Sequence, residues 1–367
     1  MTRIPLVDLG AAHAEVAADV RAGFERVIAD TAFVGGAEVA AFEHEYARFA
    51  GSRHCVGVGN GTDALELALR AVGAGPGGEV VLPANSFIAT AEAAARAGAD
   101  PVLVDCDPDT YLIDAPAALS AVGPNTKAVV PVHLYGQLAG TQRLTAALAG
   151  SGVRVVEDGA QSQGAAVGEI AATSFYPGKN LGAYGDAGAV VTDDPEIAQA
   201  VRAMGSHGGV AKYRHDMLGF NSRLDGLQAA VLRAKLPRLP EWNRARAQAA
   251  ARYDELLSGL GGIARPVTLA GNEHVWHLYV IRVEALGGDP VRRDELVAKL
   301  NANGIGAGVH YPTPIHLTPA FAYLGYKAGD FPNAEAAATR ILSLPLHPHI
   351  TADEQVQVVD ALRVALG

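Results

Sequence analysis

The sequence predicts an α/β protein in which helices cover both faces of a large, mostly parallel sheet, followed by a smaller α+β C-terminal domain. Short β-branched runs alternate with Ala/Leu-rich segments from about residue 54 to about residue 192, a pattern typical of βαβ units. The pattern becomes mainly helical after about residue 221. The chain has 367 residues, of which 49% are hydrophobic, enough for two or three domains. We expect a large domain over residues 1–240 and a small one over residues 241–367.

The elements of the large domain follow from hydrophobic periodicity and turn residues. Residues from about 11 to 50 predict two amphipathic helices broken at Phe33-Val34-Gly35-Gly36. Six β-branched runs predict strands, at 54–58, 79–82, 101–104, 128–132, 153–156 and 189–192. The segments between the runs predict helices, among them 63–72, 88–97, 142–148 and 195–204.

The remainder of the chain predicts helices and a few strands. A helix is expected at 224–236, followed by a polar helix at 242–257 that bridges the domains. Further elements are expected at 277–283 (strand), 291–303 (helix), near 305–310 (strand) and at 333–342. A final helix is expected to begin at Thr351, where Asp353 and Glu354 favour an N-terminus.

Composition argues against several classes of protein. The net charge is −10 and no basic cluster is present, so nucleic acid is not an expected partner. No apolar run reaches the roughly 18 residues that a membrane span needs, and we expect a cytoplasmic protein without membrane association. Cys55 and Cys106 both lie in apolar runs and are expected to be buried thiols, with no metal site.

Lys179 is the most informative residue of the chain. It lies in the turn Ser174-Phe175-Tyr176-Pro177-Gly178-Lys179-Asn180-Leu181-Gly182, directly after the apolar run 170–173. An amine held there, between glycines and after a buried strand, has little access to solvent. Because desolvation disfavours the charged form, such a lysine becomes a nucleophile that can form a Schiff base.

Three side chains are candidates to hold a flat, heteroaromatic ring. Asp158 and Gln161 follow the strand predicted at 153–156, at the sheet edge where ligands bind in open α/β folds. Asp158 can keep a pyridinium nitrogen protonated, and Gln161 can donate to a phenolic oxygen. Phe87 follows the strand at 79–82 and can stack on the ring. Together with Lys179 these residues suit pyridoxal phosphate (PLP), although a solvated acidic loop and a core phenylalanine remain alternatives.

A phosphate cradle is expected where the strand at 54–58 runs through glycines into a helix. In the run Gly59-Asn60-Gly61-Thr62-Asp63, free backbone N–H groups and the helix dipole favour an anion. Asn60, Gly61 and Thr62 are the candidate ligands, and the alternative is an ordinary capped turn. The glycine spacing does not match a Rossmann fingerprint, and no lysine follows the glycines as it does in a Walker loop.

Taken in order, these motifs resemble the DegT/StrS-type sugar aminotransferases, which are PLP enzymes of the aspartate-aminotransferase fold (fold type I). The resemblance extends from Phe33-Val34-Gly35-Gly36 through Gly219-Phe220-Asn221-Ser222-Arg223-Leu224-Asp225 to Leu342-Ser343-Leu344-Pro345-Leu346. One departure is the segment Ala166-Val167-Gly168-Glu169, where members of the family usually have a longer loop.

The resemblance implies roles for individual residues. Lys179 would hold PLP as a Schiff base, Asp158 would pair with the ring nitrogen, and Gln161 and Phe87 would contact the ring. Gly61, Thr62 and Ser174 would bind the phosphate, while Asn221 would reach it from a neighbouring subunit, so a homodimer with shared active sites is implied. Related sugar dehydratases carry histidine in place of this lysine, so Lys179 favours transamination.

The implied substrate is a nucleotide-linked keto sugar, with L-glutamate as the amino donor. The loop Val309-His310-Tyr311-Pro312-Thr313-Pro314-Ile315-His316-Leu317 is rich in groups that hydrogen-bond hydroxyls, and with the lysine turn it most resembles enzymes that aminate dTDP-3-keto-6-deoxyhexoses of antibiotic or surface-glycan pathways. His310, Tyr311, His316 and Tyr184 are therefore expected to contact the sugar, although a surface loop and a core tyrosine are the alternatives.

Three rival interpretations stay open at this point. The acceptor can instead be a 4-keto-6-deoxyhexose or a keto-cyclitol. Some members of the family act as regulatory or sensory proteins, but the intact Lys179, Asp158 and Gln161 argue against that role. A Rossmann-type dehydrogenase is disfavoured by the glycine spacing and because Glu79, the nearest candidate for a ribose-binding acid, opens a strand.

Overall fold

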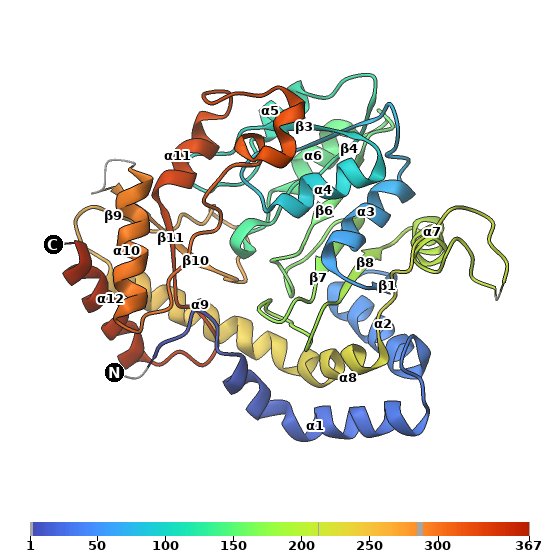
Figure 1. Ribbon diagram of the computed structural model, residues 1–367, viewed down its shortest axis with the longest axis horizontal. Helices are drawn as coiled ribbons and strands as arrows, with labels where there is room; N and C mark the ends of the chain where they lie inside the picture. Colours follow the sequence, from blue (N-terminus) through green and yellow to red (C-terminus); the bar gives the residue numbers. More distant parts are fainter. Residues whose placement is uncertain (1–2, 212, 285–288, 367) are drawn as a thin grey trace.

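A computed structural model describes residues 3–211, 213–284 and 289–366 of the chain (Figure 1). Its centre is a sheet with eight strand segments: β1 (His54–Val58), β2 (Glu79–Pro83), β3 (Asp100–Val104), β4 (Thr126–Val129), β5 (Arg154–Val155), β6 (Glu157–Asp158), β7 (Ile170–Ser174) and β8 (Gly188–Thr192). The predicted strands are confirmed within a few residues. The strand predicted at 153–156 is split into β5 and β6, and the apolar run before the Lys179 turn forms β7.

The sheet is mostly parallel, as predicted. Strands β3, β2, β4 and β5 lie side by side in that order and all pair in parallel. A parallel bridge between Val132 and Asp158 links this group to the order β6-β7-β8-β1. Strand β8 is the exception, because it runs antiparallel to both β7 and β1.

Helices cover both faces of the sheet. One face carries α3 (Gly61–Ala71), α4 (Ile88–Ala97) and α7 (Pro195–Gly205); the other carries α2 (Gly36–Ala50), α5 (Ala115–Ser120), α6 (Thr141–Leu148) and α8 (Gly226–Lys235). Successive side chains of β8 point to opposite faces of the sheet, so both faces are apolar and need helices to cover them. Val190 packs in the cluster of the first face, whereas Ala189 and Val191 pack in the cluster with α2 and α8.

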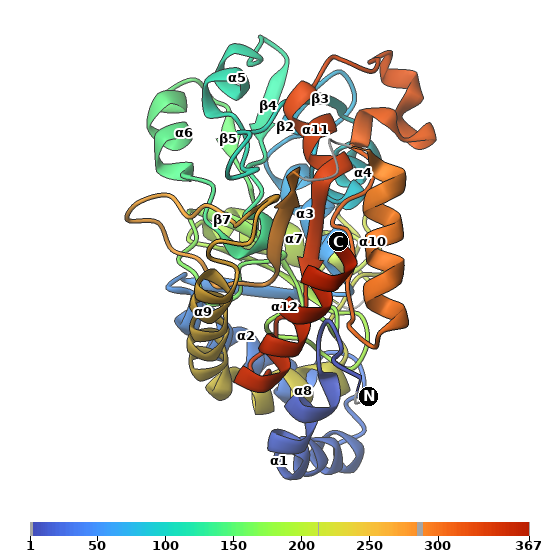
Figure 2. The ribbon, with the colours of Figure 1, turned by 90° about the vertical axis from the view of Figure 1, so that its left-hand side faces the viewer.

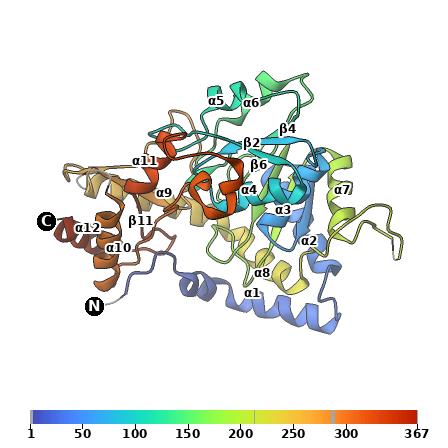
Figure 3. The ribbon, with the colours of Figure 1, turned by 45° about the horizontal axis from the view of Figure 1, so that its top comes forward.

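The N-terminal segment confirms the two predicted helices and their break. Helix α1 (Leu9–Ala29) packs along α8, with Gly23 so close that an added Cβ would lie 2.9 Å from the Cβ of Ala230. Gly35 and Gly36 both have positive φ angles and start α2 after the break. Figures 1 and 3 show α1 and α8 together along one edge of the molecule.

The C-terminal third builds a separate antiparallel sheet, in the order β11 (Ile341–Leu344), β10 (Tyr279–Val283), β9 (Ile263–Ala264). Its helices are α9 (Leu239–Leu256), α10 (Pro290–Ala302), α11 (Pro332–Arg340) and α12 (Ala352–Leu366). The short 3-10 turns Ile315–Leu317 and Pro319–Leu324 also belong to this third of the chain. Others lie earlier, at Leu134–Gly136 and Leu236–Arg238. Figure 2 faces this part of the molecule.

The strand expected near residues 305–310 is wrong. Ile305 bridges to Ile4 and Gly308 bridges to Ser343, so the segment touches two different partners for one residue each and no continuous ladder forms. The pairing also brings Ile4 into the apolar cluster of the C-terminal sheet. Across the described ranges, no helix is both long and apolar enough to cross a membrane.

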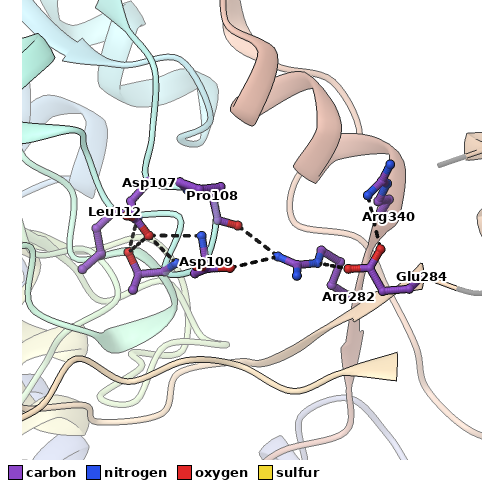
Figure 4. A network of polar contacts seen from close by, with 8 residues as sticks. Asp107, Pro108, Asp109, Leu112, Arg282, Glu284 and Arg340 are labelled. Carbon is purple, nitrogen blue, oxygen red and sulfur yellow. Dashed lines mark hydrogen bonds and ion pairs between the residues drawn. The ribbon is translucent and has the colours of Figure 1, made fainter. Parts of the chain in front are cut away.

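A polar network joins β10 to a loop of the large sheet (Figure 4). The guanidinium of Arg282 donates to the carbonyl of Pro108 at 3.1 Å and lies 3.5 Å from the carboxylate of Asp109. It also pairs with Glu284, to which Arg340 donates at 3.2 Å. The network therefore ties the C-terminal sheet to the loop that follows β3.

We predict that Arg282→Met lowers the free energy of unfolding by about 1 kcal/mol, because a partly exposed network of several charges is lost. The effect should shrink at 1 M NaCl, where ion pairs are screened. Thermal unfolding at low and high salt measures it, with Arg363→Met, which removes only the exposed pair to Asp360, as the matched control. Equal effects of the two variants would contradict the prediction.

Candidate active site

One cavity of about 700 Å³ lies at the carboxyl ends of the parallel strands. It gathers most of the predicted site residues from distant parts of the chain. Those that line it are Asn60, Gly61, Thr62, Phe87, Asp158, Gln161, Ser174, Lys179, His310 and Tyr311. The wall also includes Leu6 and Val7 from the N-terminal segment and His277 and Leu278, which directly precede β10.

The turn that carries Lys179 is held tightly after β7. The amide of Phe175 donates to Ala187 at 2.8 Å, and the amide of Lys179 donates to Tyr176 at 2.9 Å. A Cβ at Gly182 would lie 2.2 Å from the carbonyl oxygen of Pro177, so only glycine fits where the turn closes. Burial lowers the pKa of Lys179 to about 8, although the charge of Asp158 opposes the shift.

A buried lysine supports the same turn from behind. Lys235 of α8 donates from Nζ to the carbonyl of Gly182 at 2.6 Å, and its ammonium lies 4.5 Å from the centre of the Tyr184 ring. Burial lowers the pKa of Lys235 to about 8. The turn therefore rests on an element far along the chain, which local sequence patterns do not reveal.

The Asp158 carboxylate faces the cavity and is fixed by hydrogen bonds to both oxygens. Its Oδ2 accepts from the Thr90 hydroxyl at 2.8 Å, and its Oδ1 accepts from the amide of Ala160 at 3.1 Å. The Thr90 hydroxyl donates its only hydrogen to the carboxylate. Ser86 must therefore be the donor in the 2.7 Å hydrogen bond between the Ser86 and Thr90 hydroxyls. Ser86 and Thr90 both line the cavity and were not among the predicted residues.

The expected phosphate cradle has the geometry of an anion site. Asn60 caps α3 by accepting from the amide of Asp63 at 2.8 Å. The amides of Gly61 and Thr62 donate no hydrogen bond within the described part of the chain, and both residues line the cavity. A Cβ at Gly61 would lie 2.5 Å from the Cβ of Ser174, so the bare glycine lets the helix start sit against that hydroxyl.

Gln161 is held in one orientation by the two groups beside it. Its Oε1 accepts from the amide of Tyr135 at 2.5 Å, and its Nε2 donates to the Tyr311 hydroxyl at 3.1 Å. The second Nε2 hydrogen of Gln161 and the hydroxyl hydrogen of Tyr311 are then left for the cavity. The ring of Phe87, half exposed, packs on the ring of Tyr311 with centres 5.2 Å apart.

Three predicted residues contribute no surface to this cavity. The ring of Tyr184 covers Lys235 and its hydroxyl contacts His13. His316 is buried against Phe331 and bonds Glu335 at 2.9 Å. The side chain of Asn221 accepts from Arg223 at 2.8 Å, and Asn221 bridges to Ser206 at the end of α7. The loop after α7 projects away from the sheet (Figures 1 and 3).

The pattern of this site can be compared with known proteins. A dTDP-3-amino-3,4,6-trideoxy-alpha-D-glucose transaminase of Streptomyces venezuelae is 44% identical, with 98% of this chain and 96% of the relative covered. An erythromycin biosynthesis sensory transduction protein, EryC1, of Saccharopolyspora erythraea is 43% identical, with 98% and 99% covered.

Solved structures agree with these relatives. A crystal structure of S. venezuelae DesV in complex with a ketimine intermediate superposes with a TM-score of 0.95, at 43% identity, covering 100% of this chain and 99% of that one. Residues 15–363 match the family described as the DegT/DnrJ/EryC1/StrS aminotransferase family. The predicted family and its fold are confirmed: this chain belongs to the DegT/DnrJ/EryC1/StrS aminotransferases.

Proposed function

We propose that this protein is a PLP-dependent transaminase that converts a dTDP-linked 3-keto-6-deoxyhexose into the 3-amino sugar nucleotide, with L-glutamate as amino donor. The observation that carries the proposal is the meeting of the Lys179 amine and the Asp158 carboxylate in one cavity beside an anion cradle. A 4-keto-6-deoxyhexose or a keto-cyclitol is the alternative acceptor.

The residues present fit this coenzyme. A phosphate would lie on the free amides of Gly61 and Thr62 and on the Ser174 hydroxyl, whose own hydrogen is not used when it accepts from Tyr176. Asp158 would hold the ring nitrogen, and Gln161 would donate to the ring's oxygen. When bound, PLP supplies an aldehyde that exchanges amines and a ring that delocalises the charge left when a C–H proton is removed.

The chain's own residues then divide the work. With the coenzyme bound, the Lys179 amine would act as a general base that takes the proton from the donor's α-carbon and then as a general acid that returns that proton from Nζ. The lowered pKa of Lys179 suits both the removal and the return of the proton, because the neutral and the protonated amine are both populated near pH 8. Asp158, fixed by Thr90, would hold a proton on the ring nitrogen.

The proposed sugar specificity is supported by the cavity wall and by the relatives. His310 and Tyr311 offer polar groups beside the ring of Phe87, which suits a hydroxylated ring substrate. The S. venezuelae relative bears the name of a 3-amino-sugar transaminase. The S. erythraea relative bears the name of a sensory transduction protein, but the reactive groups assembled here favour catalysis.

A homodimer completes the proposed site. Asn221 would contact the phosphate of a neighbouring subunit, and the loop before it is exposed and partly apolar: Leu218 is 96% exposed and Val210 is 64% exposed. Large apolar side chains on a projecting loop are typical of an interface. We further propose domains over residues 1–240 and 241–367 and a cytoplasmic location.

Lys179→Ala should lose the visible absorption band, expected near ~410–430 nm for a lysine-bound coenzyme. Turnover should fall by at least about 10²–10⁴-fold, the contribution of a positioned acid–base group. Absorbance spectra and product assays with 3-keto, 4-keto and cyclitol acceptors measure both effects and the acceptor preference. Lys299→Ala, at an exposed lysine of α10, is the control and should keep band and rate. An active Lys179→Ala protein would overturn the assignment.

Thr90→Val should lower turnover about tenfold with little change in fold, because it removes a hydrogen bond to the Asp158 carboxylate, typically worth ~1.5–3 kcal/mol, while keeping side-chain volume. Thr90→Ser retains the hydroxyl and should restore most of the rate. Steady-state kinetics and the pH profile of the visible band check the pair. Equal rates in the two variants would show that the hydroxyl has no part in holding Asp158.

A further inference from the structure

His277 lies in the cavity wall with Lys179, and no sequence motif points to it. Its side chain is buried, and the Nδ1 atom of its ring is 3.2 Å from the Oδ1 atom of Asn180. Asn180 directly follows Lys179 and is also buried. The imidazole is thus tied to the very turn that carries the reactive amine.

The hydrogen bonds around Asn180 have only one consistent direction. Asn243 contacts the backbone carbonyl of Gln163 at 2.9 Å, and a carbonyl can only accept, so the contacting atom is the amide nitrogen of Asn243. Asn180 contacts the carbonyl of Val275 at 2.9 Å and must use its amide nitrogen there too. The same nitrogen donates to Oδ1 of Asn243 at 2.9 Å.

The direction of these hydrogen bonds determines which ring nitrogen of His277 carries the hydrogen. Oδ1 of Asn180 can only accept, so Nδ1 of His277 carries the hydrogen. Burial lowers the pKa of His277 well below its ordinary value, and the charges of Lys179, Arg246 and His310 lower it further. The ring is therefore neutral, and its second nitrogen, Nε2, on the side turned away from Asn180, bears a lone pair.

We propose that His277 is a positioning residue whose Nε2 accepts an N–H of the Lys179 amine whenever that amine is free of the coenzyme. The contact would hold Nζ inside the cavity between proton removal and proton delivery. This inference rests on the proposed role of Lys179 as the reacting amine. It adds a fixed acceptor that cannot itself compete for the proton.

Other titratable groups line the same cavity. Asp158 is held by Thr90 and the amide of Ala160. Burial, followed by the charge of Lys179, lowers the pKa of His310 to about 4, and its Nδ1 is 2.8 Å from the Ser343 hydroxyl. Asp186 lies at the exposed rim of the cavity.

The test measures the Lys179 amine in coenzyme-free protein. Trace labelling with acetic anhydride from pH 6 to pH 10, with the Lys179 peptide quantified by mass spectrometry, gives the midpoint at which the amine becomes neutral. We expect about pH 8 in the unmodified protein. His277→Phe removes the acceptor that stabilises the protonated amine, so its midpoint should fall and labelling at pH 7 should rise about two- to fivefold.

Two variants control for structural effects. His277→Gln keeps an acceptor at the position of Nε2 and should return the midpoint toward that of the unmodified protein. His274→Phe changes a partly buried histidine of the same segment, one that stacks on Trp276 and does not line the cavity, and should leave the midpoint unchanged. An unchanged or raised midpoint in His277→Phe would overturn the proposal.

A second measurement uses the unmodified protein, so it does not depend on whether a variant folds. In ¹⁵N-histidine-labelled, coenzyme-free protein, His277 should show a protonated Nδ1 and an unprotonated Nε2 between pH 6 and pH 9. A hydrogen on Nε2 would overturn the proposal. Neither measurement uses the coenzyme, so failure of Lys179 to bind PLP, which would sink the proposed function, is seen separately.

Discussion

The site depends on one constraint, which is that a lysine amine is kept out of water opposite a carboxylate. Burial by itself makes the charged amine of Lys179 unfavourable, whereas Asp158 favours it, and burial prevails, so the pKa of the amine falls to about 8. The cavity, the turn and the neighbouring hydrogen bonds all serve to keep these two groups in place without joining them in an ion pair.

Three separate layers maintain that constraint. Strand β7 and Gly182 set the turn, while Lys235 holds the turn from α8. Ser86 and Thr90 at the start of α4 orient the carboxylate from the opposite side. The C-terminal sheet closes the wall with the residues before β10, and the Arg282 network ties that sheet to the loop after β3. The positions of Lys179 and Asp158 therefore depend on elements of both the large sheet and the C-terminal sheet.

Much of this could be predicted from sequence, because alternation and glycine placement are local signals. The strands, the mostly parallel sheet and the gathering of Gly61, Asp158 and Lys179 at one sheet edge follow from such signals. The features that the sequence did not predict arise from contacts between segments far apart in the chain. The segment after Ile305 meets two partners instead of one, and His277 and Thr90 reach the cavity from positions 98 residues after and 89 residues before Lys179. Only the folded chain shows these.

The most direct test of the account is to find where the coenzyme is attached. Purified protein supplied with PLP would be reduced with borohydride, digested and mapped by mass spectrometry. The account predicts one phosphopyridoxyl group, on the peptide that carries Lys179, and none on the buried Lys235. Attachment at Lys235 alone, or no attachment in a fully folded protein, would contradict it.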